Sequence, residues 1–509
     1  MDRRKASRLH LVPRRSRWPG PGSGPGPGKL RGPWRLLGLC LVLLGCLAFA
    51  RRGYLDERTT LQGFDFKPVY SSTLCLIEGC DPYDSAQIEQ AYLRHGGDAS
   101  DLRPFRPWNA NYPPSALFLT IPLALLPFPL ARTLWLGLGM LLFCAAALAS
   151  ADLCTACPGP QDCSSATRRH PFGVLGAQAA LAVFVASSTI LVMLGQPAMY
   201  SISLVVLAVW SFLRRRALPL GVLAFAVSLT LKPHIGALLW LFFLLSSGGD
   251  SSVPATGHAA ARTVSHRRLA LYTLAATLVL MAPGLMLAAH HPASAHWPQE
   301  LHHNLVEIAS SGQASNPGPT NDEVASIASL EALFALRHDS PHFYNLAAYA
   351  TFLPFFLAWL YLLPRRSGQA VSHRTTGRGN VSAADLTALA AAAALSFLPI
   401  YHRQYDTRLL LLIFPAVAAL ACRYRWLGSA ALALSALATV TLSHQFVHLA
   451  PTMAARLVRH GKALHGVPWL ALNRPLPLTL LLLSAFFLYA MFRVATEDAP
   501  DGQAPAGNP

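Results

Sequence analysis

Charged residues are scarce in this chain. Only 13% of its 509 residues are charged and 53% are hydrophobic, whereas a soluble globular protein carries roughly 25% charged residues. Three long apolar runs, at 36–50, 269–289 and 476–491, contain no charge at all. A helix rises about 1.5 Å per residue, so runs of this length match a hydrocarbon core roughly 30 Å thick. The composition excludes a soluble enzyme and predicts an all-α integral membrane protein.

Three further features are missing. We find no internal repeat, almost no ionisable group inside the apolar runs, and no secretory cleavage pattern after the first run. A proton or ion relay would need ionisable groups at mid-membrane, and many transporters show repeated halves. The net charge of +17 is not gathered on one basic domain but lies in short clusters between apolar runs. This distribution is typical of topology signals and argues against nucleic-acid binding.

The apolar runs predict about 12 transmembrane helices between two disordered ends. Residues 1–33 are basic and Gly/Pro-rich and are expected to form a disordered cytoplasmic head, and 494–509 a disordered tail. The transmembrane domain then occupies 34–493. Its helices are predicted near 34–51, 131–151, 172–194, 198–213, 217–231, 235–247, 268–289, 343–363, 385–400, 407–422, 426–446 and 477–493.

Lysine and arginine in the short loops set the expected orientation. With the basic head in the cytoplasm, most Arg-rich clusters fall on the cytoplasmic side. This holds only if 115–130, an apolar stretch with three prolines, lies in the outer interface and does not cross. Two long loops, about 52–129 and 290–342, then face away from the cytoplasm. The first is expected to carry short interfacial helices, and the second to order over a bound acceptor.

Polar, reactive residues gather at the predicted outer ends of the helices. Five stretches, spread over some 340 positions, share this side of the membrane. They are Asp65 in the first loop, Asn111 to Pro114 with Tyr112, Gly195 to Pro197 with Gln196, Lys232 to His234, and His402 to Asp406 with Arg403 and Tyr405. The sequence therefore predicts one polar pocket at the extracytoplasmic membrane surface.

Several of these stretches, in this order, resemble glycosyltransferase family 87, which has the GT-C membrane fold. The resemblance covers roughly residues 34 to 420. It is carried by Gly63-Phe-Asp-Phe-Lys-Pro-Val-Tyr70, Glu78-Gly-Cys-Asp-Pro-Tyr83, Tyr112-Pro-Pro114, Gly195-Gln196, Lys232-Pro233 and Pro399-Ile-Tyr-His402. It implies a multi-pass enzyme of the cell membrane that transfers a hexose, commonly mannose, from a polyprenyl-phosphate sugar, with inversion. The acceptor would be a lipid- or polysaccharide-linked glycan on the extracytoplasmic face.

The residue types suit that chemistry. Inverting transfer needs one base to take the acceptor's hydroxyl proton. The leaving lipid phosphate is already anionic, so it needs positive charge and hydrogen-bond donors rather than a second carboxylic acid. We expect Asp65 to be the general base. The donor phosphate is expected to contact Lys232, His234, His402 and Arg403, and the substrates Gln196, Tyr112, Tyr405 and Asp406. No cofactor and no metal ion are expected.

Simpler roles remain open for the same residues. Asp65 could be a loop or helix-capping aspartate, and Gln196 could merely close a helix hairpin. Lys232, His402 and Arg403 could be interfacial anchors. Asp406 could pair with a neighbouring arginine. The sequence also leaves open the acceptor, the sugar and the oligomeric state.

The cysteines and loop histidines suggest other sites. Cys75 and Cys80 could form a disulfide if their loop is in an oxidising compartment. Cys154, Cys157, Cys163 and His170 have the ligand types of a zinc site, although free thiols are the simpler interpretation. The histidines between 290 and 303 lack the spacing of a defined metal site.

Two rival functions also remain. One is a lipid or solute transporter, and the other is a glycan ligase or polymerase that uses a diphosphate-linked donor. The pair His402-Arg403 keeps the second rival open.

Overall fold

The computed structural model describes residues 32–53, 63–102, 108, 110–156, 170–246, 264–365, 381–459 and 466–497. The predicted disordered head and tail lie outside these ranges, apart from 32–33 and 494–497, which belong to helices. Cys157 and Cys163 of the possible zinc site are also outside the described residues.

The described residues are almost entirely helical. The helices are α1 (Gly32–Arg51), α2 (Phe66–Glu78), α3 (Ser85–Arg94), α4 (Pro114–Phe118), α5 (Ile121–Ala124), α6 (Phe128–Cys154), α7 (His170–Ala186), α8 (Ile190–Leu194), α9 (Ala198–Arg214), α10 (Leu218–Leu231), α11 (Pro233–Leu245), α12 (His266–His290), α13 (Trp297–Ile308), α14 (Glu331–Phe334), α15 (Pro341–Arg365), α17 (Ala383–Leu395), α18 (Ile413–Arg423), α19 (Arg425–Thr441), α20 (His444–Arg459), α21 (Val467–Asn473) and α22 (Pro475–Glu497). Short 3-10 segments are η3 (Ala99–Leu102), η5 (Pro292–Ser294), η6 (Val324–Ser326) and η7 (Asp406–Leu412). Among the described residues, β-pairing is limited to one isolated bridge, between Ile327 and Arg403.

The prediction of an all-helical, multi-pass membrane protein is confirmed. Each of the twelve predicted segments falls on a helix. Among the described residues, six helices are long and apolar enough to cross a membrane, or seven if the bent pair α19–α20 is one span. These six are α1, α6, α7 with α8, α12, α15 and α22. Four shorter apolar helices, α9, α10, α11 and α17, account for other predicted segments. The full number of about twelve crossings stays a prediction.

Two of the predicted helices are broken, and serine side chains mark both breaks. Between α7 and α8, the hydroxyls of Ser187 and Ser188 donate to the carbonyl of Phe184 at 2.9 and 2.7 Å. Such bonds compete with the helical ladder. Between α19 and α20 the axis bends by 75°. There Ser443 accepts from the backbone N–H of Phe446 at 3.2 Å and so caps the start of α20.

The proline-containing stretch 115–130 does not form a span. It is divided into α4, α5 and the first residues of α6. Pro122 and Pro127 stand at the starts of new helices, where a missing N–H costs nothing. α4 packs on α12, and a Cβ added at Gly284 would approach the Pro114 carbonyl to 2.5 Å. The stretch is therefore not among the helices long enough to cross a membrane, and its position in the outer interface stays a prediction.

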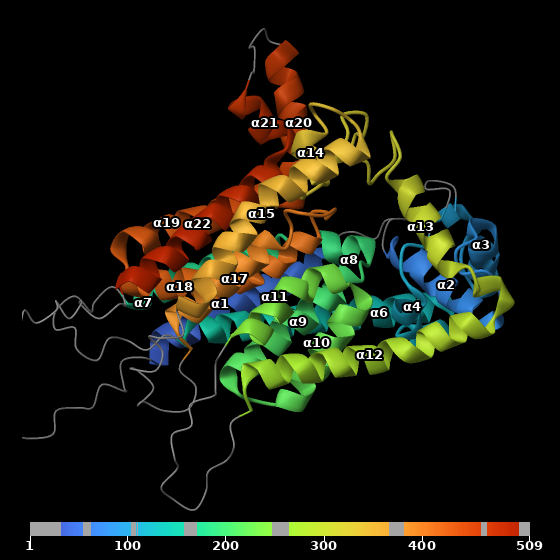
Figure 1. Ribbon diagram of the computed structural model, residues 1–509, viewed down its shortest axis with the longest axis horizontal. Helices are drawn as coiled ribbons and strands as arrows, with labels where there is room; N and C mark the ends of the chain where they lie inside the picture. The colour runs from blue at the N-terminus through green and yellow to red at the C-terminus, as the bar shows by residue number, and fades with distance from the viewer. Residues whose placement is uncertain are drawn as a thin grey trace, which may run out of the picture.

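The helices form one bundle with two appendages (Figure 1). α17 lies inside it and packs against α18, α22 and α11; all its residues from Leu386 to Leu395 are buried. Seven of the ten are alanine or threonine, and such small side chains let helices approach closely. α2, α3, α4 and α13 gather at one end of the bundle, while α20 and α21 project from its side. The α8–α9 turn, the α10–α11 break and the segment 398–406 contribute most of the polar residues described next.

Candidate active site

Backbone hydrogen bonds join residues 63–65 of the first loop to the end of α8. The N–H of Gly63 donates to the carbonyl of Met193 at 2.9 Å, and the N–H of Asp65 donates to that of Leu194 at 2.7 Å. The side-chain amide of Gln196 then donates to the Asp65 carboxylate. Asp65 precedes α2 but makes no capping hydrogen bond to it. Its carboxylate accepts from Gln196 instead, so the alternative that Asp65 only caps α2 does not apply.

Two glycines and one tryptophan fix this contact. Gly63 and Gly195 both have positive φ, at 76° and 64°. A Cβ at Gly195 would lie 2.7 Å from the Cα of Gly63, closer than real contacts allow. The indole N–H of Trp135 donates to the Gly195 carbonyl at 2.7 Å, and its ring stacks on Phe66 at 4.6 Å. Glycine is needed at position 195 because only a bare backbone fits both the conformation and the approach.

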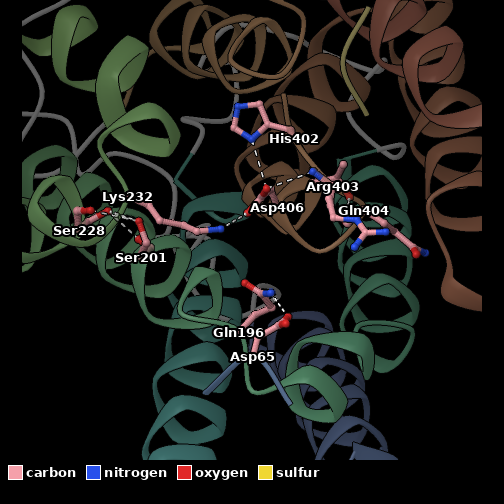
Figure 2. Close-up of polar contacts among 10 residues, drawn as sticks. Asp65, Gln196, Ser201, Ser228, Lys232, His402, Arg403, Gln404 and Asp406 are labelled. Carbon is pink, nitrogen blue, oxygen red and sulfur yellow. Dashed lines mark hydrogen bonds and ion pairs between the residues drawn. The ribbon is translucent and has the colours of Figure 1, made fainter. Parts of the chain in front are cut away.

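A second polar group centres on Asp406. Its Oδ1 lies 3.1 Å from the Lys232 Nζ, and its Oδ2 lies 3.3 Å from Nδ1 of His402. The backbone N–H of Arg403 also donates to Oδ2, at 3.2 Å. Lys232 stands in the non-helical step between α10 and α11, where Pro233 starts a new helix. Figure 2 shows Lys232 reaching across to Asp406, with Asp65 and Gln196 on the other side of the same region.

The third polar group ties the second long loop to the segment 398–406. The N–H of Ala328 donates to the His402 carbonyl at 2.8 Å, and the N–H of Gln404 donates to the Ser326 carbonyl at 2.8 Å. The Arg403 guanidinium contacts Glu323 and donates to the Ser326 hydroxyl at 3.0 Å. The loop is therefore held against the site in the described structure.

The remaining predicted residues lie around these groups. The ring of Tyr405 is 5.1 Å from the Lys232 Nζ, and the ring of His234 is 4.9 Å from that of His402. Burial raises the pKa of Tyr112 well above its usual range, and the charges of Asp65 and Asp406 add to this effect. A phenol that is influenced by both carboxylates lies near both.

Asp65 has the electrostatics of a base that works near neutral pH. Burial raises the pKa of this carboxyl to about 6, although the Gln196 hydrogen bond and the charges of Arg403 and Lys232 act in the opposite direction. A general base is most effective when its pKa lies near the working pH. Lys232 and Arg403 are the cationic side chains whose charge acts on this carboxyl.

The structure thus brings all nine predicted site residues into one region. Sequence reasoning missed two residues that position them. Glu323 holds Arg403, and Trp135 holds the Gly195 carbonyl. Neither carried a signal in the sequence, since Glu323 is one acidic residue in a polar loop and Trp135 reads as part of an apolar helix. For Asp406, the predicted pairing with an arginine side chain is replaced by pairing with Lys232 and His402.

A cavity of about 500 Å³ lies near this region, between the start of α3 and α13. Its lining is polar and includes four carboxylates, and comprises Asp81, Tyr83, Asp84, Ser85, Gln299, Glu300, His303, Asn304 and Glu307. The hydroxyl of Tyr83 donates to the carbonyl of Tyr112 at 2.9 Å, which links the cavity wall to the candidate site. The Asp84 side chain caps α3 by accepting from the backbone N–H groups of Ala86 and Gln87.

The first loop also contains a disulfide. Cys75 and Cys80 are bonded to each other just before the cavity residues. Cys40, Cys46, Cys144, Cys154 and Cys422 form no disulfide in the described part of the chain. The disulfide that the sequence left open is present, and it joins the end of α2 to the turn that precedes α3.

The chain matches the model of a known protein family. Residues 110–367, just over half of the chain, match the model of glycosyltransferase family 87. The matched range contains Tyr112, Gln196, Lys232 and His234, whereas Asp65 and the segment 402–406 lie outside it. No curated protein matches the chain, and no solved structure does. On the strength of the family match, this membrane protein belongs to glycosyltransferase family 87.

Proposed function

We propose that the protein transfers a hexose, with mannose the first choice, from a polyprenyl-phosphate sugar to a lipid- or polysaccharide-linked acceptor. The observation that supports this most is the arrangement of one carboxylate of raised pKa, Asp65, opposite two cationic side chains, Lys232 and Arg403. That is the composition needed for a single displacement with an anionic leaving group. A glycosidase would need a pair of carboxylic acids in catalytic positions.

In the proposed reaction, an acceptor hydroxyl oxygen attacks the anomeric carbon of the donor. The bond between that carbon and the phosphate oxygen breaks, and the anomeric configuration inverts. The hydroxyl proton passes to Asp65, which the Gln196 amide holds in place. The electron pair of the broken bond stays on the lipid phosphate.

Lys232 and Arg403 are proposed to bind that phosphate. Both already have carboxylate partners, Asp406 and Glu323. An ammonium has three donors and a guanidinium five, so each can keep its partner and still donate to a phosphate oxygen. The carboxylates then hold the cations in position before the donor arrives. His234 and His402 are proposed to line the same phosphate site, and Tyr405 and Asp406 its sugar side.

The acceptor is proposed to reach Asp65 from the cavity between α3 and α13. The cavity volume, about 500 Å³, falls in the range of ligand pockets. Its carboxylates and amides are acceptors and donors for sugar hydroxyls, and their negative charge would repel an acidic glycan. The expected acceptor is therefore a neutral glycan carried on a lipid or polysaccharide, and Tyr112 and Gln196 would contact it nearest the reacting carbon.

The site is proposed to face away from the cytoplasm. Two features support this orientation. The Cys75–Cys80 disulfide stands in the first loop, and such bonds persist in oxidising compartments. The Arg-rich clusters between spans are expected on the opposite, cytoplasmic side.

The test uses purified protein in lipid vesicles with radiolabelled polyprenyl-phosphate mannose and a neutral mannoside acceptor. The expected result is release of polyprenyl phosphate together with a product of inverted anomeric configuration. Consumption of a diphosphate-linked donor in place of the monophosphate would favour the ligase alternative. Movement of the labelled lipid between leaflets without bond cleavage would favour a transporter and overturn the proposal.

A further inference from the structure

Two histidines and one aspartate of the site are close enough to share an ion. His234 is the second residue of α11, Asp406 is the first residue of η7, and His402 lies four residues before it. One candidate ligand atom from each lies within 4.8 Å of those of the other two. It is the sole such group of histidine, cysteine and acidic residues in the ranges that the structure describes. The histidine-rich stretch 290–303 does not form one there.

The environment of His402 adds an independent observation. Its side chain is fully buried, at 0% exposure. Nδ1 faces the Asp406 carboxylate at 3.3 Å, whereas Nε2 is buried and has no hydrogen-bond partner. Nδ1 and the Asp406 oxygen that faces it lie close enough to bind one ion between them. An ion held by both atoms binds at Nδ1, so the unpartnered Nε2 is not one of its ligands.

We propose that His234, His402 and Asp406 form a binding site for a divalent transition-metal ion of the Zn²⁺ class. Imidazole nitrogens and one carboxylate suit such ions better than Mg²⁺ or Ca²⁺, which prefer oxygen ligands alone. Zinc ligands stand about 2.0–2.2 Å from the ion, so two ligands lie at most about 4.4 Å apart. Small side-chain rotations therefore close the site. With three protein ligands, one position stays open to water or to a phosphate oxygen.

This inference departs from the metal-free site expected from the sequence. It concerns ion binding alone and does not depend on the proposed transferase reaction. Lys232 opposes the ion, because its ammonium already lies 3.1 Å from Asp406 and repels a second cation. The site is therefore expected to bind more weakly than a closed structural zinc site. Lys232→Met removes the competing charge and is expected to tighten binding.

The experiment is a Co²⁺ titration of the full-length protein, purified in detergent without a histidine tag, followed by its visible absorption. The expected result is one equivalent of Co²⁺ with the absorption bands of a four-coordinate ion, displaced by Zn²⁺. His234→Ala should weaken binding at least about 10-fold, a typical effect of disturbing a metal site. His234 is partly exposed and begins a helix, so this variant is expected to fold.

Two matched controls exclude other histidines. His444→Ala removes one ring of the His444–His448 pair, whose centroids are 4.3 Å apart and which belongs to α20. His302→Ala/His303→Ala removes two histidines of α13. Both controls should bind Co²⁺ as the unaltered protein does. The proposal is overturned if the unaltered protein shows no four-coordinate absorption, or if His234→Ala binds as tightly while either control loses the ion.

Discussion

The side-chain amide of Gln196 donates a hydrogen bond to the carboxylate of Asp65, although 131 positions separate the two residues. The contact joins the first long loop to the turn between α8 and α9. An amide donor favours the ionised carboxylate, while burial favours the neutral form. The balance between the two leaves Asp65 able to change protonation near neutral pH, and the first two predictions depend on it.

Replacing Asp65 with asparagine should abolish transfer without unfolding the protein. We expect turnover to fall by roughly 100- to 10,000-fold, the usual contribution of a general base. The fold should persist because the Asp65 carboxylate caps no helix. Turnover is measured with labelled donor, and folding by thermal unfolding in detergent.

The matched control is Asp98→Asn, the same chemical change at an exposed position of the same loop. It should keep full turnover. If Asp65→Asn kept the turnover of the control, another residue would have to serve as base.

The pH dependence should report the protonation of Asp65. Because its pKa is raised to about 6, turnover should rise with pH through about 6 and then level off. In Gln196→Leu the hydrogen bond that lowers this pKa is lost, so the rise should move to higher pH. Rates measured between pH 5 and about 8 test both expectations. An acid limb that stays in place in Gln196→Leu would contradict the assignment.

The same raised pKa has a consequence for stability. The folded carboxyl holds its proton to higher pH than the unfolded one, whose pKa is about 3.8. Between about 4 and 6 the folded state binds more protons, so this contribution to the free energy of unfolding falls as pH rises. At pH 7 the charged, partly buried Asp65 is destabilising. Asp65→Asn should therefore raise the unfolding temperature at pH 7 but not near pH 4, as comparison of melting curves at the two values would show.

The Lys232–Asp406 ion pair should behave as a coupled unit. Lys232→Met leaves the Asp406 charge buried without its main partner, which is expected to cost about 3–5 kcal/mol of stability. Lys232→Met/Asp406→Asn removes both charges and should regain most of the lost stability. Its KM for the donor should stay raised, because the ammonium is still missing. Unfolding curves and the KM for donor separate the two effects. Recovery of activity in the double variant would show that Lys232 does not contact the donor.

The orientation of the site can be tested with single cysteines in a background in which every cysteine except Cys75 and Cys80 is replaced. Ser100→Cys stands at an exposed position of the first loop, and Ser429→Cys at an exposed position of α19. A membrane-impermeant maleimide should label Ser100→Cys in intact cells and Ser429→Cys only after permeabilisation. Cys75 and Cys80 should react only after reduction. The reverse labelling order would place the site in the cytoplasm.

Much of the fold could be predicted from apolar runs alone. Hydrophobic length fixes where helices form in a membrane protein, and every predicted segment falls on one. The breaks were harder to predict. Ser187, Ser188 and Ser443 end helices through local hydrogen bonds, and serine occurs too often inside membrane helices to mark a break.

The sequence predicted that the site residues lie together, because they share one end of the helices. It did not predict which of these side chains form hydrogen bonds and ion pairs with one another. Asp406 could have joined Arg403, Arg408 or Lys232 with similar charge logic, and the choice of Lys232 depends on how α10 ends. Glu323 reaches Arg403 only because the loop pairs with residues 402–404 through its backbone. The sequence does not show which of these backbone segments lie next to each other.

The contact between Gly63 and Gly195 leaves no space for even a methyl group. The carboxylate and the amide that holds it are thus mounted on one shared piece of main chain, supported by Trp135. Gln196 leads into α9, and Ser201 of α9 is hydrogen-bonded to Ser228 of α10, the helix that ends at Lys232. The packing of α9 on α10 therefore also sets the distance between Asp65 and Lys232, and a movement of the first loop that separates them would have to break the contact at Gly195.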